Sequence, residues 1–264
     1  MKSTLSESSD EEWEKWGKKD PYFGVLTNES FRKENLDAAA LSEFFRQGES
    51  DINELIDIFK SRFGVDLSPK RSIDFGCGVG RVLIPLARIS EETIGVDVSV
   101  SMLNEAHRNC QKKNISNVRL LKLSDYRENS SLSVDFIHSM IVFQHIPTTR
   151  GIVLFNTLLT NLRPGGLGAI HFLYSKSEYS NNNGIQKEVS IFRKTKRKVK
   201  RILRLIKFRS EIDPFMEMNC YNLNQIIHIL QNDNIKEFYT KLTDHGGCWG
   251  VLLAFQKEAS PNQA

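Results

Sequence analysis

The chain has 264 residues, of which 40% are apolar and 26% are charged, a composition typical of globular proteins. This length fits one α/β domain with additions better than two complete domains. The net charge is +4, but ten basic residues and no acidic ones lie between Arg193 and Arg209. Because the rest of the chain is therefore acidic overall, the composition excludes a uniformly basic nucleic-acid binder.

The N-terminal sequence MKSTLSESSDEEWEKW is acidic and polar, whereas a secretory signal has a positive start and an apolar run. No window approaches the roughly 18 consecutive apolar residues of a transmembrane helix. The four cysteines form no Cys-x-x-Cys pair, which is typical of reduced thiols in a cytoplasmic protein. No His or Cys cluster has the spacing of metal ligands, so the sequence predicts no metal ion.

Three parts follow one another along the chain. Residues 1–12 contain one aliphatic side chain, which predicts a disordered tail. Residues 13–64 are rich in aromatics and then follow a 3.6-residue apolar period, which predicts an N-terminal helical cap, or arm. Residues 65–264 alternate short apolar runs with amphipathic stretches, which predicts an α/β domain with a parallel sheet and helices on both faces. The predicted strands are 72–75, 93–96, 118–123, 134–139 and 167–173, and the predicted helices are 79–88, 101–113 and 150–162.

The regular alternation stops after the fifth predicted strand. Residues 175–220 are polar and then basic, so we interpret them as an insertion. A helical pattern resumes over 221–230, and the runs 235–242 and 248–255 predict an antiparallel hairpin that closes the sheet.

The most informative stretch is residues 71–81, RSIDFGCGVGR, an apolar strand that leads through glycines into a helix. The glycines permit positive φ and let a ligand approach the backbone; they are Gly76, Gly78 and Gly80. A nicotinamide dinucleotide site requires its third glycine where Arg81 stands. Asp74 would place a negative carboxylate near the negative phosphates of a dinucleotide. A ligand with a cationic group, such as the ammonium of an amino acid, suits Asp74 better.

A second acid, Asp97, ends the next predicted strand, about twenty residues further on. A carboxylate at this position can accept hydrogen bonds from both ribose hydroxyls of a nucleoside. The alternative is that Asp97 caps the helix that follows. Its spacing from the glycine loop favours ribose binding.

These motifs resemble the class I S-adenosylmethionine-dependent methyltransferases, in their bacterial, small-molecule branch. Residues 74–80 are similar to the family's first motif, 135–147 to the segment of its fourth strand, and 162–166 to the turn before its fifth. The resemblance covers about residues 65–175. It implies a Rossmann-like, doubly wound sheet of seven strands in the order 3-2-1-4-5-7-6, with the N-terminal cap and the insertion after strand five added to it.

The resemblance also implies a cofactor, S-adenosyl-L-methionine, and a set of residues that bind it. Asp97 is similar to the ribose-binding acid, Val98 and Met102 to the apolar residues beside the adenine, and Asp125 to the adenine-contacting acid. The full expected set is Asp74, Gly76, Gly78, Gly80, Asp97, Val98, Met102, Ser124 and Asp125. The arm is expected to fold over the cofactor with Tyr22 and Phe23 near the pocket, unless these rings only pack the cap onto the sheet.

Methyl transfer depends mainly on aligning the acceptor, the methyl group and the leaving sulfur. For an oxygen acceptor, a base adds rate, and His145 has a suitable ordinary pKa. The alternative is that His145 only satisfies a backbone carbonyl before Pro147. The DNA-methylating branches need an Asn/Asp-Pro-Pro-Tyr/Phe or a Pro-Cys motif, and the chain has neither. We therefore expect no DNA partner and an oxygen acceptor on a sugar, a lipid-linked glycan or another small molecule.

The basic stretch 193–209 predicts an amphipathic helix. It would suit peripheral contact with the anionic inner membrane surface, an acidic substrate or RNA, or it would cover the active site as a lid. Two other functions stay open: a dinucleotide-dependent oxidoreductase, and a non-catalytic module that binds membrane or RNA through this helix. The presence of both Asp74 and Asp97 favours an active methyltransferase.

Overall fold

The computed structural model describes residues 4–128, 132–177 and 213–259. They form one seven-stranded sheet in the order β3-β2-β1-β4-β5-β7-β6, which confirms the predicted order. The strands are β1 (Arg71–Phe75), β2 (Glu92–Asp97), β3 (Val118–Lys122), β4 (Val134–Ser139), β5 (Leu162–Lys176), β6 (Phe238–Asp244) and β7 (Cys248–Gln256). The α-helices are α1 (Thr4–Lys19), α2 (Pro21–Val25), α3 (Ala38–Ile58), α4 (Leu83–Arg88), α5 (Val100–Lys112), α6 (Leu123–Glu128), α7 (Thr148–Asn161) and α10 (Leu223–Asn232).

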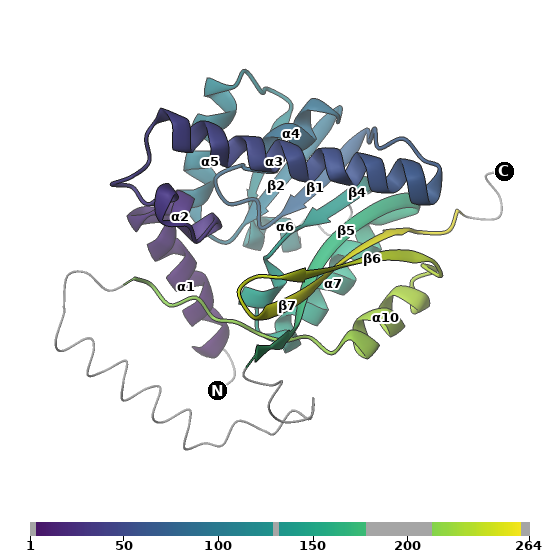
Figure 1. The fold of residues 1–264 in the computed structure, drawn as a ribbon. Helices are drawn as coiled ribbons and strands as arrows, with labels where there is room; N and C mark the ends of the chain where they lie inside the picture. The colour runs from purple at the N-terminus through teal and green to yellow at the C-terminus, as the bar shows by residue number, and fades with distance from the viewer. Residues whose placement is uncertain (1–3, 129–131, 178–212, 260–264) are drawn as a thin grey trace, which may run out of the picture.

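Two layers of helices enclose the sheet (Figure 1). On one face, Leu55 of α3 and Leu86 of α4 belong to the same buried cluster as Phe136 of β4. On the other face, Phe155 of α7 and Ile226 of α10 join the largest buried cluster. Strands β1 to β5 are parallel, and β7 lies antiparallel between β5 and β6. The predicted doubly wound α/β architecture is therefore confirmed.

Side-chain caps explain where two of the longer helices begin. The carboxylate of Asp37 accepts a hydrogen bond from the Ala40 N–H at 2.8 Å and caps α3. The hydroxyl of Ser99 accepts from the Met102 N–H at 3.1 Å and caps α5. These residue types are favoured at N-caps because their short side chains satisfy N–H groups that have no partner within the helix.

Helix α1 is the main departure from the predicted organisation. The disordered tail expected over residues 1–12 is wrong for the described part of that range, because α1 covers residues 4–12. The hydroxyl of Ser9 donates to the His145 carbonyl at 3.0 Å, and Asp10 forms a two-pronged ion pair with Arg150 at 2.7 and 2.8 Å. These specific polar contacts offset the ordering entropy, which the composition alone does not do.

Two other element boundaries differ from the prediction. The helix predicted over 79–88 begins at Leu83, because the loop glycines before it have positive φ. Strand β5 extends beyond the predicted range 167–173 at both ends. At the N-terminal end Leu162 pairs with β4 across an irregularity over residues 163–166, and at the C-terminal end Ser175 and Lys176 pair with β7.

The predicted insertion is described only at its two ends. The basic stretch 193–209 lies outside the described residues, so its role stays a prediction. Among the residues that the structure does describe, none of the helices is both long enough and apolar enough to cross a membrane.

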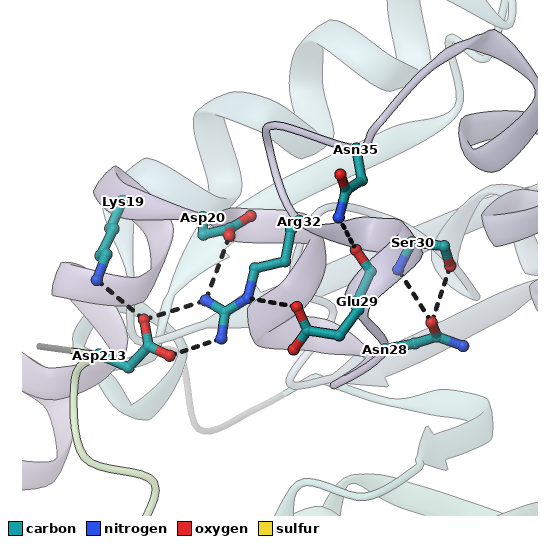
Figure 2. Close-up of polar contacts among 8 residues, drawn as sticks. All are labelled: Lys19, Asp20, Asn28, Glu29, Ser30, Arg32, Asn35 and Asp213. Carbon is teal, nitrogen blue, oxygen red and sulfur yellow. Dashed lines mark hydrogen bonds and ion pairs between the residues drawn. The ribbon is translucent and has the colours of Figure 1, made fainter. Parts of the chain in front are cut away.

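Arg32 joins the arm to the described C-terminal end of the insertion (Figure 2). Its guanidinium donates to both carboxylate oxygens of Asp213 at 3.0 and 2.6 Å. It also lies 3.5 Å from Asp20 and 3.7 Å from Glu29, and 3.3 Å above the ring centroid of Phe23. The planar, permanently charged guanidinium suits such a site, where it pairs and stacks at once. The segment that begins at Asp213 is thereby held beside α1, as Figure 1 shows.

Candidate functional site

A cavity of about 780 Å³, counted with its open mouth, lies at the carboxyl edge of the sheet. Its walls come from the loop after β1, the end of β2, the start of α5, the segment after β4, and the N-terminal arm. The strand order reverses between β1 and β4, and open α/β sheets bind ligands at this point.

The glycine loop forms the floor of the cavity. Gly76 has φ +77° and Gly78 has φ +53°, a region that other residues rarely adopt. A Cβ atom at Gly76 would lie 2.3 Å from the Val142 side chain, and one at Gly78 would lie 2.6 Å from Val25. The two glycines are therefore required both by backbone conformation and by the close approach of neighbouring walls.

Asp97 reaches the same loop from the end of β2. Its carboxylate accepts hydrogen bonds from the N–H groups of Gly78 and Ser99, both at 2.9 Å. Burial raises the pKa of the Asp97 carboxyl to about 6, although these N–H groups act to lower it. Since the N-cap of α5 is Ser99, the helix-cap alternative does not account for Asp97. The carboxylate is placed to accept hydrogen bonds inside the cavity.

The other expected cofactor residues divide into two groups. Val98 and Met102 line the cavity, together with Leu123, which the sequence did not single out. Ser124 and Asp125 are exposed and do not line it. Helix α6 begins directly after β3, so Leu123 turns inward and the next two side chains turn to solvent. Contact of Asp125 with a nucleoside stays a prediction that this geometry does not support.

A second, smaller cavity of about 350 Å³ adjoins the first. The two share Val25, Gly76, Met140 and Ile141 as lining residues, so they meet above the glycine loop. Asp74 lines only the second cavity. The third loop glycine, Gly80, with φ +91°, lines neither cavity and faces α4 and α5 at ordinary contact distances.

Asp74 is held by a histidine on the neighbouring strand. Nδ1 of His138 donates to the Asp74 carboxylate at 2.8 Å, and both side chains are buried. His138 is therefore a buried residue of β4 whose ring is hydrogen-bonded to Asp74. The contact fixes the position of the Asp74 carboxylate at the edge of the second cavity.

Ile141 carries a backbone signal that sequence reasoning missed. It has φ +61°, which for a β-branched residue is uncommon and strained. Residues in sparsely populated conformations cluster at functional sites, where the surrounding structure enforces them. Ile141 lines both cavities, so the strain lies at their junction.

His145 lines the larger cavity, with an exposed fraction of 9%. Its Nδ1 donates to the Glu217 carbonyl at 2.7 Å, and its Nε2 accepts from the Gln144 amide at 3.1 Å. Burial lowers the pKa of His145 to about 4, although the Glu217 carbonyl acts to raise it. The ring is therefore uncharged at neutral pH. It satisfies a backbone carbonyl, as the alternative expects, and it also faces the cavity.

The arm covers the cavity with residues other than those expected. Tyr22 donates to Glu105 at 2.7 Å on the side of α5, and Phe23 lies beneath Arg32; neither ring lines a cavity. Trp13 lines the cavity instead and meets the His145 ring edge-on at 4.8 Å between centroids.

Comparison with known proteins identifies the family of the domain that contains this site. A family model described as a methyltransferase domain matches residues 73–166, the span that holds the glycine loop, Asp97 and the segment after β4. Residues 73–166 are a class I S-adenosylmethionine-dependent methyltransferase domain. S-adenosylmethionine is the cofactor that such a domain takes, and the resemblance seen in the sequence is confirmed.

Curated relatives match only part of this chain. A ubiquinone biosynthesis O-methyltransferase of Acinetobacter baylyi is 24% identical over 102 residues, which are 38% of this chain and 42% of that protein. A probable fatty acid methyltransferase of Mycobacterium tuberculosis is 28% identical over 97 residues, 37% of this chain and 23% of that protein. The chain thus spans less than half the length of these curated relatives.

Solved structures match over more of the chain. The magnesium protoporphyrin IX methyltransferase of Synechocystis PCC 6803, with bound S-adenosylmethionine, has a TM-score of 0.57 at 14% identity, covering 98% of this chain and 100% of that one. The N-methyltransferase NodS of Bradyrhizobium japonicum has a TM-score of 0.57 at 14% identity, covering 95% and 98%. At such identities the likeness concerns the fold.

Part of the larger cavity is lined by residues that the sequence did not mark as functional. Ser9, Asp10, Trp13 and Arg150 all line the larger cavity. Ser9, Trp13 and Trp16 are spaced as neighbours on one helix face, which was the available signal for this helix. Arg150 gave no signal, because nothing in its local sequence distinguishes it from a surface residue.

Proposed function

We propose that the chain is an S-adenosylmethionine-dependent enzyme that transfers a methyl group to an oxygen of a small-molecule acceptor. The observation that carries this proposal is the pair of joined cavities, with Asp97 in one and Asp74 at the edge of the other. A nucleoside needs hydrogen-bond acceptors for its ribose hydroxyls, and an amino-acid end needs a carboxylate for its ammonium group. The two carboxylates meet these needs on either side of the glycine loop.

The residues present fit such a cofactor. The glycine loop leaves no room for a Cβ at Gly76 or Gly78 and brings backbone to the cavity floor. Val98, Met102 and Leu123 supply an apolar wall beyond Asp97, which suits a flat heterocycle such as adenine. When bound, S-adenosylmethionine supplies a methyl group already activated by its sulfonium.

Little chemistry then remains for the protein beyond positioning and exclusion of water. The strained backbone at Ile141 and the Trp13 ring from the arm both contribute rigid walls. Rigid walls favour methyl transfer because they hold the acceptor in line with the methyl group. Such alignment alone substantially lowers the activation barrier of the transfer.

His145 is our candidate for the group that accepts the proton of an acceptor hydroxyl. It is uncharged at neutral pH and faces the cavity. Its lone pair is on Nε2, which accepts a hydrogen bond from the Gln144 amide, so an acceptor hydroxyl would have to replace this amide to deliver its proton. A pKa of about 4 nevertheless makes it a weaker base than an ordinary histidine. We therefore assign most of the rate to alignment and a smaller share to His145.

The acceptor class rests on the relatives and on the sequence. The relative from Acinetobacter baylyi is named an O-methyltransferase of ubiquinone biosynthesis, which supports an oxygen acceptor on a small molecule. Sugars and lipid-linked glycans remain in the proposal as hydroxyl-bearing acceptors.

The test is transfer of labelled methyl from S-adenosylmethionine to a panel of hydroxyl-bearing aromatics, sugars and lipid-linked glycans, each paired with its amine analogue. We expect label on a hydroxyl acceptor, and loss of labelling in Asp97→Ala. Asp66→Ala is the matched control, because Asp66 is exposed and pairs with Lys60 away from the site. Label on amine analogues alone would refute the oxygen acceptor, and unchanged labelling by Asp97→Ala would refute the assigned cofactor site.

A further inference from the structure

Residues 213–221, which we call the return segment, contain no helix or strand, yet hydrogen bonds hold them at both ends. At the start, Asp213 pairs with Arg32 of the arm (Figure 2). Two residues later, the Phe215 N–H donates to the Glu12 carboxylate of α1 at 2.6 Å. An irregular segment that is fixed in this way has a defined position, so the groups it contacts indicate what it does.

The far end of the return segment is anchored by Tyr221. Its ring is buried, and its hydroxyl donates to the Ile146 carbonyl at 2.9 Å. Helix α7 has a glycine where this ring docks, since a Cβ atom at Gly151 would lie 1.8 Å from the Tyr221 hydroxyl oxygen. Nearby, Nζ of Lys176 at the end of β5 donates to the Met218 carbonyl at 2.5 Å. These two anchors enclose residues 218–221 and fix the carbonyl that precedes them.

That preceding carbonyl, of Glu217, lies 2.7 Å from Nδ1 of His145. A carbonyl oxygen only accepts hydrogen bonds, and an uncharged imidazole carries one N–H. The proton of the uncharged ring is therefore on Nδ1, and the lone pair is on Nε2. The two nitrogens differ in this respect because of a residue 72 positions away in the sequence.

The neighbouring amide of Gln144 does not determine the tautomer by itself. Its nitrogen lies 3.1 Å from Nε2 of His145, while its oxygen is buried and has no hydrogen-bond partner among the described residues. An amide has a donor end and an acceptor end, so a half-turn would let it accept from an Nε2–H instead. The Glu217 carbonyl has no such alternative, and it is the contact that distinguishes the two tautomers.

We propose that the return segment positions His145 for proton acceptance, because its Glu217 carbonyl holds the ring in the tautomer whose lone pair is on Nε2. The inference deepens the proposed function and rests on it, since His145 is the proton acceptor assigned there. Lys176 and Tyr221 are the positioning residues, because they hold the carbonyl in place. The competing explanation is that the segment only closes the fold over α7 and that Gln144 sets the tautomer.

The proton transfer follows from this arrangement. The acceptor hydroxyl displaces the Gln144 amide from Nε2, and its O–H bond breaks as the proton bonds to Nε2. The oxygen bonds to the methyl carbon, whose bond to sulfur breaks. The ring is then a cation with a proton on each nitrogen, and the Glu217 carbonyl still accepts from Nδ1.

The test is ¹⁵N NMR of the histidine rings at pH 7, because ring nitrogens with and without a proton resonate far apart. The variant Lys176→Met/Tyr221→Phe removes both anchors of the Glu217 carbonyl, and His145→Gln assigns the signals. We expect the proton on Nδ1 in wild type. In the double variant, the ratio of the Nδ1–H to the Nε2–H tautomer should fall at least about fivefold, the usual effect of losing one hydrogen bond.

The matched control is Lys257→Met/Tyr126→Phe. Lys257 also donates to a backbone carbonyl, at 3.0 Å, and Tyr126 is a buried tyrosine whose hydroxyl accepts a hydrogen bond at 2.7 Å. Neither residue contacts the return segment through these bonds. The control thus loses hydrogen bonds of the same kinds, and we expect its His145 tautomer to match wild type.

The outcomes separate the two explanations. A fall in the tautomer ratio in the return-segment variant, but not in the control, supports the proposal. An unchanged ratio in the return-segment variant overturns it and assigns the tautomer to Gln144, and an equal fall in both variants overturns it because general loosening would explain it. Wild type with the proton on Nε2 also overturns it, even where the variant fails to fold. Titration with S-adenosylhomocysteine tests the proposed function separately: folded wild type that does not bind it refutes that function, whatever tautomer the ring has.

Discussion

Glu14 anchors helix α1 to the start of α5 through three hydrogen bonds, and its removal is a quantitative test of how the arm is held. Its carboxylate accepts hydrogen bonds from the hydroxyls of Ser99 and Ser101, both at 2.7 Å, and from the Ser101 N–H at 3.1 Å. Burial alone would raise the pKa of Glu14, but these hydrogen bonds lower it to about 2. We therefore predict that Glu14→Gln destabilises the protein.

The size of this effect follows from the pKa. A fall from 4.5 to about 2, at 1.36 kcal/mol per unit, corresponds to about 3 kcal/mol. Because the side chain is 28% exposed, solvent screens part of this, and Gln retains one oxygen acceptor. The expected loss at pH 7 is about 1–2 kcal/mol. A carboxyl whose pKa is lowered in the folded state stabilises it above pH 4.5, and this contribution is lost as the pH falls toward 2.

Urea denaturation at pH 7 and pH 4 measures this contribution. Glu11→Gln is the control, since Glu11 is exposed on the same helix and the change in charge is identical. We expect the control to stay within about 0.5 kcal/mol of wild type, as surface substitutions usually do. We also expect the deficit of Glu14→Gln to shrink at pH 4. Equal stability of the two variants at pH 7, or a deficit that is the same at both pH values, would refute the reasoning.

Three further predictions concern the cavity. Since ribose binding needs the ionised Asp97 carboxylate, with its pKa of about 6, affinity for S-adenosylhomocysteine should fall about tenfold in total between pH 7 and pH 5; a pH-independent affinity in calorimetry would contradict this, and Asp97→Asn should bind weakly at every pH. In urea denaturation, Gly76→Ala should lower the free energy of unfolding by more than Gly165→Ala does. Both glycines have positive φ, but only a Cβ at residue 76 would collide with Val142; equal losses of stability would argue against this clash. The pH profile of methyl transfer should lack an inflection near pH 6.5, because the pKa of His145 is about 4; such an inflection, abolished by His145→Gln, would show that burial does not shift it.

The sheet, and the carboxyl edge at which its cavities lie, could be predicted from local sequence. Each parallel strand is an apolar run, and the loops after β1 and β2 carry three glycines and an acid at characteristic spacing. Asp97 and Gly76 were identifiable because a turn that needs positive φ and a carboxylate at a strand end leave local signals. These signals do not depend on the packing of distant segments.

The part of the site that helix α1 and the segment after β4 contribute could not be predicted in the same way. Asp10 lies in the acidic segment 1–12, whose composition predicts disorder, and Glu14 lies at the start of the predicted cap. Their stabilising partners, Arg150, Ser99 and Ser101, are distant in sequence. The strain at Ile141 likewise arises from tertiary packing rather than from residue type. Such contacts between remote segments lie beyond composition and periodicity.

The central claim is that the joined cavities bind S-adenosylmethionine through Asp97. The most direct measurement is calorimetric titration of S-adenosylhomocysteine into wild type and Asp97→Ala, with NAD and NADP as control ligands. We expect micromolar binding of S-adenosylhomocysteine by wild type, at least tenfold weaker binding by Asp97→Ala, and no binding of NAD or NADP. Absence of S-adenosylhomocysteine binding by folded wild type, or equal binding by Asp97→Ala, would contradict it.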